Sequence, residues 1–248
     1  MMGAERFDRY YEAQGSAGDE VFTPETEFET EEISLSGSAR AASVNARSVK
    51  ISGSAAVTGE IRSGTLGCSG SVHAGGNVKS AEIKVSGSFE TGGSISSMNC
   101  HVSGSCRVGS AVRAETLLSV SGSLSAAAAS SGRRVEILGS INADTLSAPE
   151  VEIEGGGKVG TLSCRNAVIN MHGKNGRLIN RLAGRGRSML TVEKIEAEGE
   201  VTVDRCIVGT LSAGTVKIGR DCRVRSVTYT EACTAEKGAE VGSSTRRA

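Results

Sequence analysis

The sequence has very few bulky side chains. Its 248 residues include no Trp, three Tyr, four Phe and only two Pro. A large globular core needs more volume than this composition supplies, so the composition favours a thin core lined by small aliphatic residues. No run approaches the roughly 20 apolar residues of a membrane-spanning helix, and no segment has the charged-then-apolar pattern of a secretion signal. We therefore expect a cytoplasmic protein.

Patterns that carry catalysis or bind metal are also missing from the sequence. The three histidines, His73, His101 and His172, form no cluster with metal-ligand spacing, and no HExxH, GxSxG or P-loop pattern occurs. The seven cysteines are an odd number without a CxxC pair, which indicates reduced thiols that fill a core. We expect no catalytic residue, no cofactor and no bound metal, and hence no enzyme.

Glycine, in contrast, is abundant and regularly spaced. Among the 33 glycines, the triplet Ser-Gly-Ser recurs six times, at positions 36, 52, 69, 86, 103 and 121, which is a period of about 17 residues. Two degenerate copies follow around Gly139 and Gly155. Self-similarity at a short fixed period is typical of a protein that stacks one small unit many times.

Each repeat carries apolar residues at fixed distances from its glycine. Two residues before the glycine stand Leu35, Ile51, Cys68, Val85, Val102, Val120, Ile137 and Ile153. Further apolar positions follow two, four, eight and thirteen residues after the glycine, the last of them holding Leu66, Ile83, Cys100 and Leu117. Steps of two residues are typical of strands with one buried face. Three such segments per repeat predict a triangular parallel β-helix of about 17 residues per turn, spanning residues 33–245 in about 11 or 12 turns.

The repeat is interrupted once, by a basic segment. The period continues to Gly173, but the next comparable glycine is only Gly199, which predicts an insertion of about nine residues within 174–187. This segment has no acid and five cations: Lys174, Arg177, Arg181, Arg185 and Arg187. The cations are candidates for contact with an anionic surface, membrane lipid first. The alternative is an arginine-rich loop that packs its aliphatic residues on the flank of the solenoid. Nucleic acid is not an expected partner, because no aromatic residues alternate with the cations.

The N-terminal residues 1–32 differ from the repeat. They hold ten acids and two arginines, a composition that predicts a disordered acidic arm. Phe7, Tyr10 and Tyr11 would share one face of a helix over residues 4–14. Two interpretations stay open for them: a docking motif for a partner, or a flap that covers the first turn. Residues 246–248 form a short tail after the β-helix.

The stacked apolar-Ser-Gly-Ser turns resemble the bactofilins, which are polymer-forming cytoskeletal proteins of bacteria. The stretches 216–229 and 235–241, and the late basic insertion, are similar to the longer bactofilin-like proteins of Gram-positive bacteria. The resemblance covers residues 33–245. It implies a right-handed β-helix that assembles end to end into nucleotide-independent filaments, often at the membrane. Expected partners are copies of the same chain, the anionic inner face of the membrane, and other scaffold or envelope proteins.

Two other classes of protein also build solenoids. Acyltransferases of the left-handed hexapeptide-repeat type want near-regular turns, with an aliphatic residue at every sixth position and a catalytic His, whereas the interval here varies between successive copies. A secreted solenoid adhesin or ice-binding protein is disfavoured by the missing signal and by the seven cysteines. The sequence therefore favours a structural protein that assembles through the ends of its rod, where strands expose unpaired backbone groups.

Overall fold

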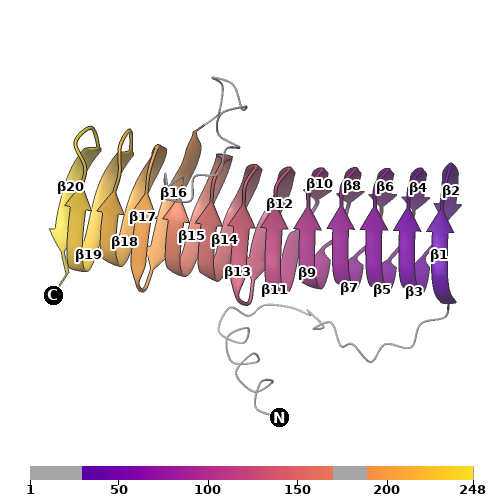
Figure 1. The fold of residues 1–248 in the computed structure, drawn as a ribbon. Coiled ribbons are helices and arrows are strands. Elements are labelled where there is room, and N and C mark those ends of the chain that lie inside the picture. The colour runs from indigo at the N-terminus through magenta and orange to yellow at the C-terminus, as the bar shows by residue number, and fades with distance from the viewer. Residues whose placement is uncertain (1–29, 170–188, 248) are drawn as a thin grey trace, which may run out of the picture.

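The computed structural model describes residues 30–169 and 189–247, and all regular structure in them is β-strand. The strands stack along one axis (Figure 1). Their bounds are β1 (Thr30–Leu35), β2 (Ser38–Ala41), β3 (Val44–Ile51), β4 (Ser54–Val57), β5 (Ile61–Cys68), β6 (Ser71–Ala74), β7 (Val78–Val85), β8 (Ser88–Thr91), β9 (Ile95–Val102), β10 (Ser105–Val108), β11 (Ala111–Val120), β12 (Ser123–Ser131), β13 (Arg134–Ile137), β14 (Ser140–Ile153), β15 (Gly156–Ile169), β16 (Leu190–Ala197), β17 (Glu200–Val203), β18 (Cys206–Ile218), β19 (Arg223–Ala235) and β20 (Glu240–Arg246).

One turn of the solenoid contains three inward-facing segments. In β3, Val44 and Ala46 are buried, a corner follows, and then Val49 and Ile51 are buried. In β4 the buried residues are at alternate positions again. The step of three residues inside β3 marks the corner, because a straight strand would keep the step of two. Three segments and three corners per turn give the triangular cross-section that the sequence predicted.

Strands of successive turns pair in parallel, so equivalent residues form columns along the axis. One column runs from end to end through Leu35, Ile51, Cys68, Val85, Val102, Val120, Ile137, Ile153, Ile169, Val203, Ile218 and Ala235. Its first eight members are the apolar residues that precede the repeat glycines. The parallel β-helix with about 17 residues per turn is thereby confirmed, and it has about 12 turns.

The repeat glycines stack at one corner in close contact with the turn below. A Cβ atom placed on Gly87 would lie 1.9 Å from the carbonyl oxygen of Gly70. The same oxygen accepts a hydrogen bond of 2.9 Å from the backbone N–H of Ser88. The Ser-Gly-Ser triplet thus reflects a position where only glycine leaves room for the adjacent backbone.

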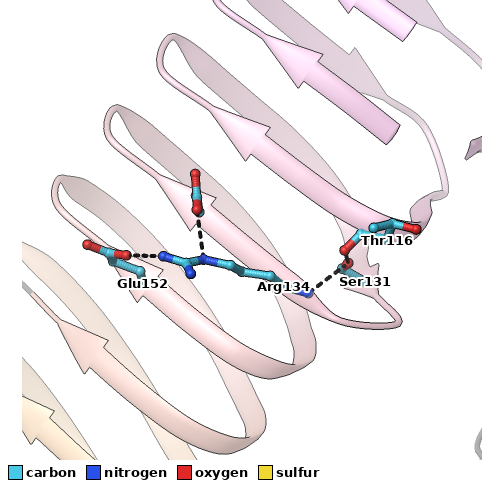
Figure 2. A network of polar contacts seen from close by, with 5 residues as sticks. Thr116, Ser131, Arg134 and Glu152 are labelled. Carbon is cyan, nitrogen blue, oxygen red and sulfur yellow. Dashed lines mark hydrogen bonds and ion pairs between the residues drawn. The ribbon is translucent and has the colours of Figure 1, made fainter. Parts of the chain in front are cut away.

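One expected core position was wrong. Leu117 is only half-buried, whereas its neighbour Leu118 is fully buried. The register shifts between Ala114 and Leu117, because this turn has one residue more than the turn before it and the extra residue lies before this slot. In the next turn, Ser131 fixes the same corner: its hydroxyl accepts the backbone N–H of Arg134 at 3.3 Å and donates to the carbonyl of Thr116 at 3.0 Å (Figure 2).

The insertion is longer than the glycine spacing predicted. Ile141 pairs with Gly157 in the next turn, and Gly157 pairs with Leu190 in the turn after it. The chain from Gly157 to Leu190 is about twice as long as the chain from Ile141 to Gly157. The insertion therefore has about the length of one full repeat, and not about nine residues. Gly199 is not a repeat glycine, because it lies at another corner, where its N–H donates to the carbonyl of Arg165 at 2.8 Å. The glycine spacing gave the wrong insertion length because the repeat position after the insertion holds Arg205, with a φ of 46°, instead of a glycine.

Candidate functional site at the two ends of the solenoid

The apolar columns that begin at Ile33, Leu35 and Ala41 are buried inside the rod, but these first members are only half-buried. Ile51, the second member of its column, is 2% exposed, while Leu35 before it is half-buried. Ile33 and Ala41 are half-buried in the same end layer, and Cys233 and Val241 are half-buried in the last layer. Each end therefore presents the cross-section of an apolar core.

The end strands also carry unpaired backbone edges. Among the described strands, β1 and β2 pair only with β3 and β4, on one side. At the other end, within the part of the chain that the structure describes, β20 pairs only with β19, and residues 232–235 of β19 pair only with β18. Figure 1 shows these strands as the outermost layers of the stack. A strand edge with free N–H and C=O groups is a template for another strand.

No helix lies across either end within residues 30–169 and 189–247. Globular solenoids need a terminal cap with a polar outer face to stay separate. Both ends are therefore candidate contact surfaces. In the described part of the chain, each has an apolar face and open strand edges, and no helix covers it.

Charged residues on the outer faces form ladders between adjacent turns. At the first turn, Glu31 pairs with Arg47 at 2.9 Å, and at the last turn Glu240 pairs with Arg223 at 3.0 Å. Pairs of the same kind occur within the rod, as in Figure 2, where Arg134 contacts Glu152 at 2.6 Å. Exposed pairs of this kind contribute about 0.2–1 kcal/mol each, so each adds little to the stability of the rod.

The thiols are part of the core. Six of the seven cysteines are buried. Burial raises the pKa of Cys68 to about 11 and the pKa values of Cys106 and Cys164 to about 12. The Sγ atoms of Cys206 and Cys222 lie 3.8 Å apart, and this hydrogen bond, followed by burial, raises the pKa of Cys206. Thiols with a raised pKa are protonated near neutral pH, and the protonated form is a poor nucleophile.

Two histidines lie on the outer faces. The ring of His73 is 66% exposed, with its Nδ1 3.8 Å from Glu90, and His101 stacks between outward positions of neighbouring turns. His172 lies outside the described residues. In the part of the chain that the structure describes, no group of three His, Cys, Asp or Glu could hold a metal ion. No helix long and apolar enough to cross a membrane occurs there either.

Two sets of predicted site residues lie outside the described residues. They are the cations Lys174, Arg177, Arg181, Arg185 and Arg187, and the aromatic residues Phe7, Tyr10 and Tyr11 of the arm. Ile169 and Leu190 are the nearest strand residues on either side of the basic segment. The first described strand begins at Thr30, three residues before the expected start of the β-helix, and the last ends at Arg246.

Sequence reasoning missed a buried polar column. Ser63, Ser80 and Ser97 point into the core ten residues after their repeat glycines. The Ser63 hydroxyl donates to Oγ of Ser80 at 3.0 Å, and Ser80 donates to the carbonyl of Glu82 at 3.0 Å. A signal was present, because the turns on either side of these serines hold another small residue, alanine, in the same slot, at Ala46 and Ala114.

Comparison with known proteins gives no neighbour: no family model, no curated protein and no solved structure matches this chain. The fold defines its class as a parallel β-solenoid.

Proposed function

We propose that this chain is a structural scaffold protein of the bactofilin-like cytoskeletal kind, which assembles end to end into filaments without a nucleotide. The observation that carries the proposal is the state of the two ends. Within residues 30–169 and 189–247, each end layer has half-buried apolar column residues and a strand edge without a partner strand, as Leu35 and Val241 illustrate. Contact between ends buries both, so assembly gains apolar burial and backbone hydrogen bonds in one step.

The uniform cross-section of the rod supports the same function. The column that begins at Leu35 continues without a gap to Ala235, so the two end layers have equivalent positions. Assembly of such layers needs no conformational change and no chemical energy. The role is structural and not catalytic, in keeping with thiols held protonated in the core.

The basic segment gives the scaffold a second contact. The segment between β15 and β16 carries five positive charges: Lys174, Arg177, Arg181, Arg185 and Arg187. Each cation near an anionic lipid surface is worth about 1 kcal/mol. A filament repeats this segment once per copy, so many weak contacts add along its length. We place the filament in the cytoplasm, at the inner face of the membrane.

The proposal is tested by assembly of the purified full chain in buffer without nucleotide. Sedimentation velocity over a range of concentrations should show species that grow beyond the monomer. Ile33→Glu should prevent growth, because it places a charge in the half-buried end column. Ser34→Glu, on the exposed face of the same strand, is the matched control and should assemble normally. A parent protein that stays monomeric at every concentration would contradict the proposal.

A further inference from the structure

We infer that Cys206 and Cys222 form a reversible disulfide bond when the chain meets a hydroperoxide, and that this bond ties together two turns near the C-terminal end of the solenoid. Neither thiol has a role in the proposed function. Three observations support the bond: the position of the two thiols, the difference in their acidity, and the small side chains that surround them.

The two thiols lie one above the other in successive turns. Cys206 begins β18, and Cys222 directly precedes β19, whose first residue pairs with Ile207. Their Sγ atoms are 3.8 Å apart and in contact within the core. Neighbouring strands lie about 4.8 Å apart, inside the range of about 4.4–6.8 Å that separates the Cα atoms of a disulfide. Rotation of the side chains can therefore bring the two sulfurs to bonding distance.

The pair is distinct among the cysteines of the described chain. The other five each pair, in the neighbouring turns, with residues other than cysteine: Cys68, Cys100, Cys106, Cys164 and Cys233. An oxidant therefore meets one pair of thiols that is already stacked between adjacent turns.

The two thiols differ in acidity, as the two steps of disulfide formation require. The hydrogen bond from the Cys206 thiol lowers the pKa of Cys222, and backbone hydrogen bonds from Cys206 and Arg205 act in the same direction, against burial and the charge of Asp204. The same hydrogen bond between thiols raises the pKa of Cys206. The thiolate is the form of cysteine that attacks an oxidant. Cys222 is therefore the attacking thiol, and Cys206 resolves the intermediate.

One molecule of hydrogen peroxide is consumed for each bond. The Cys222 thiolate attacks one peroxide oxygen, the O–O bond breaks, and the leaving hydroxide takes up the proton that Cys222 had released, which gives water and a sulfenic acid on Cys222. The Cys206 sulfur then attacks the sulfenic sulfur. The S–S bond forms, the S–O bond breaks, and the second hydroxide leaves as water with the proton of Cys206. Both thiols are oxidised and the peroxide is reduced.

The oxidant reaches the pair through the last layer of the rod. Both thiols are 0% exposed. Among the described residues, the layer above Cys222 supplies only Ala239 to this column, a small side chain that is half-buried. It precedes β20, whose residues are almost all exposed and whose partner strand lies on one side only. The end layers of a stacked repeat open most readily, so opening of β20 exposes Cys222 while the rest of the rod stays folded.

The bond strengthens a weakly packed part of the core. Along this column, the side chains become smaller toward the end, from Leu190 to Cys206, Cys222 and Ala239. Smaller side chains bury less apolar surface, so these turns separate more easily than those below them. A link between residues 16 apart in sequence holds two turns together and restricts the unfolded chain. Parallel neighbours hold their Cβ atoms farther apart than most disulfides do, so the bond is easily reduced again.

The test maps disulfides in the full-length parent. The reduced protein is treated with increasing hydrogen peroxide under native conditions, the remaining thiols are blocked with N-ethylmaleimide in denaturant, and the chain is digested with trypsin. Trypsin cleaves after basic residues, so the bond joins the peptides 206–217 and 221–223. Met189, which is 43% exposed, reports in the same digest how far the oxidant has acted. We expect the linked peptides before Met189 is oxidised, and their separation by dithiothreitol. Oxidised Met189 with both thiols still free, or a mixture of disulfides among all cysteines, would overturn the inference.

Single variants separate the roles of the two thiols. In Cys206→Ala the sulfenic acid on Cys222 has no resolving partner, so dimedone should label it. In Cys222→Ala both the bond and the label should be lost, because the raised pKa keeps Cys206 protonated. Equal labelling of the two variants would overturn the assignment of the attacking thiol. Should either variant fail to fold, the linked peptides of the parent still decide whether the bond forms.

A pair placed one turn deeper tests the route of the oxidant. Leu190→Cys combined with Cys222→Ala stacks two thiols in the same column, one turn farther from β20. This pair should oxidise more slowly than the parent pair, and equal rates would rule out entry through the last layer.

Thermal unfolding measures the effect of the bond on the rod. The oxidised parent should unfold about 5–10 °C above the reduced parent. The variant with both Cys206→Ala and Cys222→Ala should show no difference between the two treatments. Equal midpoints for the oxidised and reduced parent, with the linked peptides present, would overturn the stabilising role of the bond.

Discussion

The corner glycines allow a sharp test of the packing between turns. Gly87→Ala and Gly67→Ala add the same methyl group at two positions of the repeat. At Gly87 the new Cβ would lie 1.9 Å from the carbonyl oxygen of Gly70, whereas at Gly67 the nearest atom is the oxygen of Val49, at 4.0 Å. The first change requires adjacent turns to separate, and the second fills open space.

The magnitudes follow from these contacts. Forcing a methyl group into closed packing costs about 1–3 kcal/mol, and separation of the turns also weakens the 2.9 Å hydrogen bond from Ser88 to Gly70, worth about 1 kcal/mol. We expect Gly87→Ala to lose about 3 kcal/mol, which lowers the thermal midpoint by roughly 6–12 °C for a chain of this size. Gly67→Ala should be neutral or stabilising by about 0.4–1 kcal/mol, since alanine has less freedom in the unfolded chain.

The assay is thermal unfolding followed by circular dichroism, with the two variants and the parent at one concentration. Because repeat arrays can unfold in more than one step, midpoints of the main transition are compared. Equal midpoints for Gly87→Ala and Gly67→Ala would refute the explanation of the Ser-Gly-Ser repeat by contact between turns.

Four further predictions use the same surfaces. Val85→Asp should cost several kcal/mol, because Val85 is 2% exposed, while Lys84→Asp beside it should change stability by less than about 1 kcal/mol; comparable losses in denaturant midpoints would refute the assignment of faces. The raised pKa of Cys68, about 11, means that the folded state keeps a proton that the unfolded state loses near pH 8.5, so stability should fall as pH rises from about 9 to 11, and less in Cys68→Val; identical pH profiles would contradict this. Replacement of all five cations of 174–187 by Ser should abolish sedimentation with anionic liposomes at low salt, and unchanged binding would remove the lipid contact. Deletion of residues 1–29, which leaves β1 intact, should lengthen the filaments if the acidic arm restrains assembly, and electron microscopy showing shorter filaments would count against that role.

The fold could be predicted because equivalent residues of successive turns recur at a nearly constant interval in the sequence. Leu35, Ile51 and Cys68 share a column since equal intervals in sequence become equal heights along the axis. The prediction failed where the interval changed. One extra residue before Leu118 shifted the buried position from Leu117 to Leu118. The turn between Ile169 and Val203 is longer than predicted, because Gly199 was taken for a repeat glycine.

The contact surfaces were harder to predict than the core. The pattern indicated that the ends matter. That Arg40 and Glu240, 200 residues apart in sequence, are the two ends of one outward column appears only when the pairing of every turn is known. The buried serines Ser63 and Ser80 were missed for a different reason, because an apolar-polar pattern assigns serine to the outer face. Their hydrogen bonds to each other and to the backbone are visible only in three dimensions.

End-to-end assembly is tested most directly by electron microscopy of frozen, unstained full-length protein prepared without nucleotide. About 12 turns at about 4.8 Å give a subunit length of roughly 58 Å. We expect thin filaments whose axis is the solenoid axis, with a meridional spacing near 4.8 Å and about 58 Å of filament length for each copy. Particles that remain single rods at high concentration, or that associate only side by side, would contradict it.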